Sequence, residues 1–82
     1  MSITFDEAWL PTMVAQTRAR QVYRDGETVG RIRRWQNAEE GDVVREHFTA
    51  ERFANAFYVQ IEGEHATFED ALARLLLYGV AH

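Results

Sequence analysis

Apolar and polar residues alternate most regularly over residues 56–62. Every second residue there is large and apolar, namely Phe57, Val59 and Ile61, and Gly63 follows. A period of two is typical of a strand that buries one face. The pattern therefore predicts a half-buried strand that ends at Gly63. The opposite face of this strand would carry Tyr58, Gln60 and Glu62.

Two more strands are predicted on either side of Asp25-Gly26, over residues 20–24 and 27–35. A two-residue Asp-Gly connection favours a type I′ turn, because both residues accept positive φ. Directly opposed residues of such a hairpin share a face. The expected pairs are Arg24 with Glu27, Val22 with Val29, Arg20 with Arg31, and Arg18 with Arg33. The other face would be the core face, with Tyr23 and Ile32 as anchors beside Ala19, Gln21, Thr28 and Gly30.

A helix is predicted near the start of the chain, where Thr4 and Glu7 have the spacing of a capping box. Pro11 cannot lie inside a regular helix without the loss of a hydrogen bond. Either the helix kinks at Pro11, or a first turn ends near Leu10 and a second helix spans residues 11–17. The apolar stripe of this region would be Phe5, Ala8, Trp9, Met13 and Val14.

A second helix is predicted after Thr67, which is a good N-cap. Glu69 and Asp70 suit the positive end of its dipole, and Gly79 fits the position just past its last turn. Its apolar stripe is Phe68, Ala71, Leu72, Leu75 and Leu76. We expect the stripe to pack against Phe57, Val59 and Ile61.

Residues 36–42 are predicted to be a polar loop, whereas residues 43–54 are ambiguous. Val43 and Val44 could begin a strand, or residues 49–54 could form a helical turn. The element order is therefore α-β-β-(loop)-β-α. We predict one α+β domain over residues 1–82, with an antiparallel sheet packed on helices.

The predicted element order resembles that of double-stranded RNA-binding domains. That family has a lysine-rich start to its last helix, which this chain lacks. Glu69 and Asp70 occupy the start instead, and their charges would repel phosphate. The resemblance therefore implies the topology and not the function.

Composition narrows the classes of protein that the chain could belong to. Apolar residues make up 46% and charged residues 27% of the 82 residues, which is typical of a globular domain. The chain has no cysteine, which excludes a disulfide framework and a cysteine zinc site. No apolar run is long enough to span a membrane, and the first residues lack the pattern of a signal peptide. We therefore expect a cytoplasmic protein.

The charges are unevenly distributed along the chain, whose net charge is −4. All nine basic residues are arginines. Residues 18–35 hold six of them and two acids, a net +4, and the rest holds three arginines and eleven acids, a net −8. On the expected register, Arg20 and Arg31 would form a like-charge pair on one face. This face is either a solvated sheet surface or a site for phosphate or carboxylates. The residues proposed for it are Arg18, Arg20, Arg24, Arg31, Arg33 and Trp35.

An acidic loop follows the arginine-rich residues 18–35 and has the opposite charge. It is either solvated or a contact for a basic partner, and its residues are Glu39, Glu40 and Asp42, with Glu46 nearby.

No residue pattern in the chain indicates catalysis. His47, His65 and His82 form no metal-binding pair, and the glycines form no phosphate-binding loop. We expect no enzyme activity, no metal and no cofactor.

In size, charge and lack of a catalytic pattern, the whole chain resembles the small proteins of phages and mobile elements, of which anti-CRISPR proteins are the best-known group. The resemblance implies an inhibitor or adaptor that binds a protein, such as a host effector complex, in the host cytoplasm if a phage encodes it. From the charge distribution and the lack of a membrane-spanning run, we expect weak or no binding of nucleic acid and none of membranes. The alternatives are a nucleic-acid-binding module that uses the arginine hairpin, and a homo-oligomer with Trp35, Phe53 and Tyr58 in its interface. The net −8 outside the hairpin favours the protein binder, because it repels a polyanion.

Overall fold

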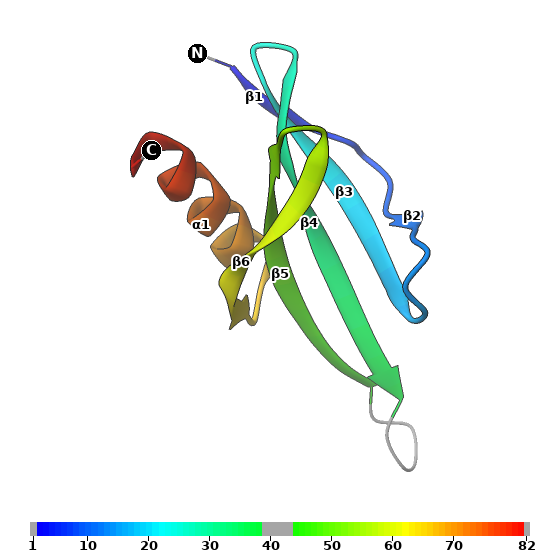
Figure 1. Ribbon diagram of the computed structural model, residues 1–82. Helices are drawn as coiled ribbons and strands as arrows, with labels where there is room; N and C mark the ends of the chain where they lie inside the picture. Colours follow the sequence, from blue (N-terminus) through cyan, green and yellow to red (C-terminus); the bar gives the residue numbers. More distant parts are fainter. Residues whose placement is uncertain (1, 39–43, 82) are drawn as a thin grey trace.

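A computed structural model describes residues 2–38 and 44–81, which form an antiparallel sheet of six strands with one helix on one face (Figure 1). The strand order is β1-β3-β4-β5-β6, and β2 also pairs with β3. The α+β class is confirmed, but the predicted order is wrong because the chain begins with strands. The elements are β1 (Ile3–Phe5), β2 (Leu10–Pro11), β3 (Thr17–Arg24), β4 (Glu27–Ala38), β5 (Val44–Ala54), β6 (Phe57–His65) and α1 (Phe68–Ala81).

The predicted N-terminal helix is replaced by two short strands at the sheet edge. β1 pairs with the end of β3 that precedes the turn, and β2 pairs Pro11 with Arg18. A proline is tolerated at an edge strand, where its missing N–H is not needed. The segment thus satisfies its backbone by pairing with β3 instead of forming a helix around Pro11. The likeness in element order to double-stranded RNA-binding domains is lost with that helix.

The β3–β4 hairpin is confirmed, but its predicted register is wrong beyond the turn. Asp25 and Gly26 have positive φ values of 50° and 85°, and Arg24 pairs with Glu27 as expected. A β-bulge then leaves Val29 as an extra residue, so Val22 pairs with Gly30. A bulge of one residue exchanges the faces of everything beyond it. It brings Val22 and Ile32, both 0% exposed, to the same side.

Residues 44–54 form a strand, so the predicted alternative of a helical turn over residues 49–54 is wrong. β5 and β6 are joined by a second two-residue turn, in which Asn55 and Ala56 have positive φ values of 53° and 68°. The alternation predicted for β6 is present, but only Ile61 of its apolar residues is buried. Phe57 and Val59 remain 71% and 41% exposed, contrary to the expected packing on the helix.

The C-terminal helix begins as predicted and extends further than predicted. The Thr67 hydroxyl accepts a hydrogen bond from the Asp70 backbone N–H at 3.1 Å, which confirms the N-cap. α1 continues through Gly79 to Ala81, so the predicted end at Gly79 is wrong.

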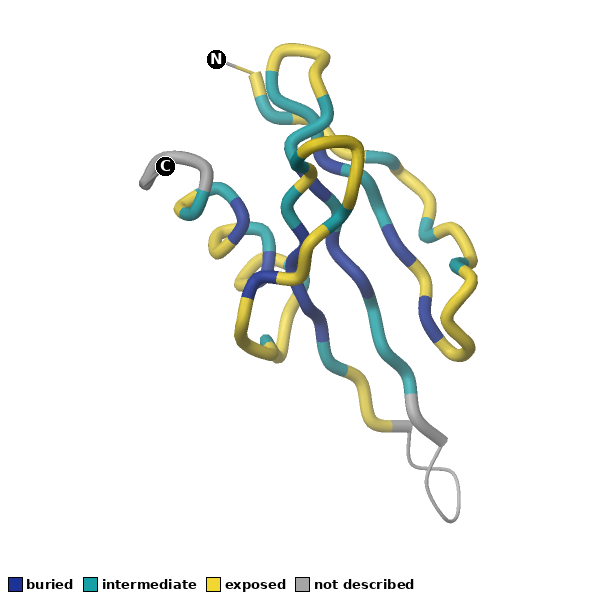
Figure 2. Tube along the Cα trace, viewed as in Figure 1, coloured by how far each residue is buried: buried dark blue, intermediate teal, exposed yellow. Residues whose placement is uncertain are grey.

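The core lies between α1 and the middle of the sheet, where Figure 2 shows a buried band across β3, β4 and β5. The Tyr23 side chain does not belong to it, because it faces away from α1 and donates to Asp6. Of the two predicted anchors, only Ile32 is therefore correct. The buried apolar cluster is Val22, Ile32, Phe48, Ala50, Ile61, Ala71 and Leu75.

Replacing Leu75 with alanine is expected to lower the free energy of unfolding by about 2–4 kcal/mol, because the residue is 3% exposed and the cavity would not collapse fully. Leu77→Ala is the matched control on the same helix, since Leu77 is 65% exposed and its loss should cost less than about 0.5 kcal/mol. Urea unfolding followed by circular dichroism measures both. Equal losses in the two variants would contradict the observed helix orientation.

Candidate functional site

The bulge at Val29 divides the predicted arginine face between the two sides of the sheet. We call the side that packs on α1 the helix face and the other side the open face. Alternation from the observed register places Arg18, Arg20 and Arg24 on the helix face. Arg31, Arg33 and Trp35 lie on the open face. The prediction that these six residues share one surface is therefore wrong, and so is the expected pairing of Arg20 with Arg31.

On the open face, two arginines clamp one buried carboxylate. The Glu51 carboxylate accepts a hydrogen bond from the Arg31 Nε and another from the Arg33 Nε, each at 2.7 Å. The side chains of Glu51 and Arg33 are 6% and 8% exposed. Burial by itself would raise the pKa of Glu51. The hydrogen bonds and charges of the two arginines outweigh burial, so the pKa is lowered overall.

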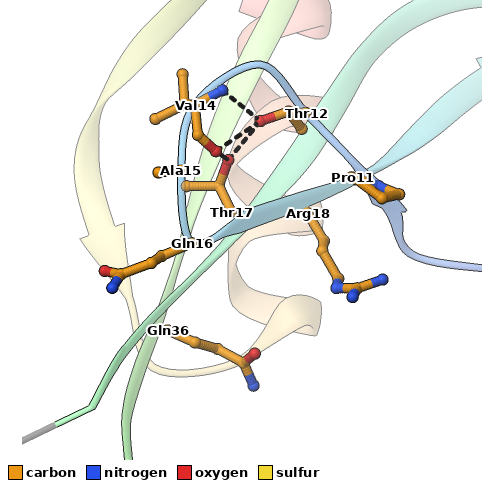
Figure 3. A pocket seen from close by; sticks show the side chains of 8 residues that line it. All are labelled: Pro11, Thr12, Val14, Ala15, Gln16, Thr17, Arg18 and Gln36. Carbon is orange, nitrogen blue, oxygen red and sulfur yellow. Dashed lines mark hydrogen bonds between the residues drawn. The ribbon is translucent and has the colours of Figure 1, made fainter.

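Arg33 makes two further hydrogen bonds in this network. The Arg33 Nη1 donates to the hydroxyl of Thr12 at 3.0 Å and to that of Thr17 at 2.9 Å. The two hydroxyls contact each other and tie the turn after β2 to the sheet, as the dashed lines in Figure 3 show. The Arg31 guanidinium stacks 4.0 Å from the centroid of the Tyr58 ring. These arginines are thus held by structural contacts, and only Arg31 keeps partial exposure.

Trp35 belongs to the same face and is also anchored. Its indole N–H donates to the Thr49 hydroxyl at 2.9 Å, and its ring stacks on His47 with centroids 5.7 Å apart. Phe53 and Tyr58 contact each other further along the sheet, with centroids 5.0 Å apart. The three aromatic residues predicted for a self-interface therefore share one face but form two separate contacts.

The helix face carries a second cluster, in which three arginines lie side by side. Arg18 of β3 is directly opposite Arg34 of β4, and Arg20 follows Arg18 on the same face. We call Arg18, Arg20 and Arg34 the arginine surface. A like-charge pair directly across two strands is destabilising. The sequence predicted a pair of arginines opposite each other in this hairpin. Such a pair is present, but it consists of Arg18 and Arg34 and not of Arg20 and Arg31.

Acidic side chains neutralise this surface only in part. The Glu46 carboxylate lies 3.8 Å from the Arg34 Nε, which is too long for a hydrogen bond. The Arg34 Nε is buried and has no acceptor among the described residues. The Arg20 Nε donates to the backbone oxygen of Asp6 at 2.6 Å. No ion pair or hydrogen bond of the Arg18 side chain occurs within residues 2–38 and 44–81. Within that part of the chain, an exposed guanidinium without an ion pair thus lies next to a guanidinium whose buried Nε has no acceptor.

Aromatic rings hold the arginine surface in place. Trp9 packs beneath the guanidinium groups of Arg20 and Arg34, whose Cζ atoms lie 5.3 Å and 4.8 Å from its ring centroid. Arg20 also lies over the rings of Phe5 and Phe68, at 4.6 Å and 4.8 Å. Such contacts stabilise a cation by about 0.5–1 kcal/mol at exposed sites and more where water is excluded. The two guanidinium groups are therefore ordered before any partner binds.

One exposed apolar side chain, that of Val14, lines the same hollow as Arg18. The turn between β2 and β3 lines an open hollow of about 500 Å³, and Figure 3 shows the Arg18 guanidinium projecting away from the hydroxyls of Thr12 and Thr17. Val14 of this hollow is 43% exposed. Leu10 and Met13, which are 55% and 104% exposed, line a second hollow with Arg31 and Arg33 instead. The first hollow thus combines the exposed Arg18 guanidinium with a small apolar area.

The other predicted site residues do not join either cluster in the described structure. Arg24 lies at the far end of β3, beside the turn. Glu39, Glu40 and Asp42 lie outside the described residues. In the described part of the chain no group of acidic or histidine side chains could hold a metal ion. No described helix is long and apolar enough to cross a membrane.

Comparisons with protein-family models, with curated proteins and with solved structures found no match.

Sequence reasoning missed three residues that organise these surfaces: Trp9, Arg34 and Glu51. If residues 44–54 are taken as a strand, alternation places the Glu51 side chain on the opposite face from Phe48 and Ala50. The sequence therefore held a signal for Glu51. Trp9 and Arg34 carried no such signal, because their contacts depend on the pairing of the N-terminal segment with β3.

Proposed function

We propose that the protein is a non-catalytic binding protein, an inhibitor or adaptor, whose arginine surface docks on carboxylates of a protein partner. The observation that carries the proposal is the direct pairing of Arg18 with Arg34, in which Arg18 is exposed and has no ion pair or hydrogen bond among the described residues. A partner's carboxylate at the Arg18 guanidinium would relieve the repulsion and accept charge-assisted hydrogen bonds from it.

The surroundings of Arg18 favour a protein over a nucleic acid. Val14 is 43% exposed and lines the same hollow as Arg18, and protein interfaces combine apolar side chains with arginine. A phosphate backbone offers little that these side chains could bury. The net charge of −4 also repels a polyanion at long range.

A protein this small would act by covering part of a partner's surface. Anti-CRISPR proteins, which the chain resembles in size and charge, act in this way on host effector complexes. A host complex of that kind is therefore the first partner to test.

The test compares capture by three tagged proteins from nuclease-treated host lysate: wild type, Arg18→Glu and Arg74→Glu. Arg74 is an exposed helix arginine without a hydrogen bond or ion pair among the described residues, so its replacement changes the charge equally. We expect Arg18→Glu to weaken partner binding at least about 30-fold, because truncating one member of a desolvated charge pair costs about 2–5 kcal/mol. Arg74→Glu should change it less than about threefold.

Melting temperatures of the three proteins provide the folding control, and Arg18→Glu should not lower stability because it relieves the like-charge pair. Equal retention of a partner by both variants would exclude the arginine surface. Capture that occurs from untreated lysate but not from nuclease-treated lysate would instead assign the surface to nucleic acid.

A further inference from the structure

We infer that β6 is a dimerisation edge, at which a second copy of the chain pairs antiparallel with it around Val59. The inference is independent of the proposed function, because the arginine surface lies on β3 and β4. β6 is the last strand in the sheet order and pairs only with β5 among the described strands (Figure 1). Its outer backbone groups are therefore open to another strand.

The turn before β6 determines which backbone groups point outward. Because the β5–β6 turn has two residues, Ala54 and Phe57 form the hydrogen-bonded pair that closes it. Alternation then directs the N–H and C=O groups of Tyr58, Gln60 and Glu62 away from β5. An incoming strand would find these groups evenly spaced along the edge.

The first half of this edge lacks the usual protection against pairing. Residues 57–61 contain no charge and no proline, which are devices that natural edges use to avoid association. Phe57 and Val59 are 71% and 41% exposed, and Leu77 of the adjoining helix is 65% exposed. Protection begins only afterwards, with Glu62 and with Gly63 at a φ of 122°.

The sequence of the strand is complementary to itself in one register. With Val59 opposite Val59 of the partner subunit, Phe57 faces Ile61 of the partner subunit and Tyr58 faces Gln60 of the partner subunit. Apolar residues then meet apolar residues across a twofold axis, as an isologous interface requires. Both Glu62 side chains fall beyond the paired stretch, opposite the turns.

A register shifted by one residue at the axis is less complementary. With Gln60 on the axis, Phe57 would face Gly63 of the partner subunit and lose its apolar neighbour. The stretch 57–61 therefore provides its own best partner strand, which favours a second copy over an unrelated segment.

The pairing covers only five residues of each strand, less than the roughly 1,200–2,000 Å² of a standard interface. We therefore expect a weak dimer with a dissociation constant on the order of 10–100 μM. Such an equilibrium is detectable by sedimentation across protein concentrations from about 5 μM to 500 μM.

Disulfide trapping tests the register directly, because the chain has no cysteine of its own. Val59 does not direct its backbone groups outward, so the pair on the axis is a non-hydrogen-bonded one with Cα atoms about 4.5 Å apart. That separation lies within the range of a disulfide. Under mild oxidation Val59→Cys should form a covalent dimer at least about tenfold faster than Met13→Cys, whose site is fully exposed but distant.

Charge exchange supplies the second test. Val59→Lys and Val59→Glu should each sediment as monomers up to about 500 μM, because like charges would meet on the axis. An equimolar mixture of the two should recover the dimer, while Arg18→Glu should dimerise as wild type does. A wild-type protein that stays monomeric at about 500 μM, or equal trapping of the two cysteine variants, would overturn the inference.

Discussion

Replacing Gly30 with alanine is expected to destabilise the protein by about 3 kcal/mol or more, which is a large part of the stability of so small a domain. A Cβ atom at this position would overlap the backbone oxygen of Glu51 and lie 2.8 Å from the Leu75 Cδ1. The backbone oxygen cannot move without disturbing the β4–β5 ladder. The end of the Leu75 side chain can turn aside, so relief of the overlap requires β4 and β5 to separate at this point and lose ladder hydrogen bonds.

Gly26→Ala is the control for Gly30→Ala, because nothing lies within 4 Å of its added Cβ atom. Its cost should be about 1 kcal/mol, from the positive φ of the turn alone. Urea unfolding at neutral pH compares the two. A loss below about 1 kcal/mol for Gly30→Ala would show that the backbones of β4 and β5 do not approach as closely at Gly30 as the structure has it.

Replacing Glu51 with alanine should cost about 3–5 kcal/mol. Removing one member of a buried ionic group leaves the other charges without compensation, and here the Arg31 and Arg33 guanidinium groups would both lose their acceptor. Glu51→Gln should cost less, because it keeps the shape and one acceptor oxygen. Glu62→Ala is the exposed control on the neighbouring strand and should stay within about 0.5 kcal/mol of wild type.

The same carboxylate predicts how stability changes with pH. The pKa of Glu51 is lower in the folded protein than its ordinary value of 4.5. Its contribution is therefore fully present above about pH 4.5 and is lost as the pH falls through the folded value. Unfolding curves measured between pH 7 and pH 3 should show this loss in wild type and a smaller one in Glu51→Gln. Parallel profiles for the two proteins would contradict the assignment of Glu51 as the buried anion.

Features that depend on neighbouring residues could be predicted from the sequence. The turn at Asp25-Gly26 follows from the tolerance of two adjacent residues for positive φ, and the start of α1 follows from the short reach of the Thr67 hydroxyl. The α+β class and the buried inner face of the last helix follow in the same way. Each depends on contacts within a few residues of one chain segment.

Features that depend on distant segments were decided only by the tertiary structure. Val22 and Ile32 are both fully buried, and the register without a bulge would have placed them on opposite faces. Burying both favours the extra residue at Val29, and that single residue sends Arg31 and Arg33 to the other side of the sheet. The N-terminal segment likewise pairs with β3 because an edge was available there.

In the candidate site too, some features follow from neighbouring residues and others depend on distant segments. The sequence by itself determined that the arginines gather around one hairpin and that like charges would meet there. Only the folded chain decided that Arg18 meets Arg34, that Glu51 neutralises the open-face arginines, and that Trp9 supports the others. The physical reason is that the charge of a side chain follows from the residue type alone. The partner of that side chain depends on strand register. Register in turn depends on which apolar residues the whole fold can bury together.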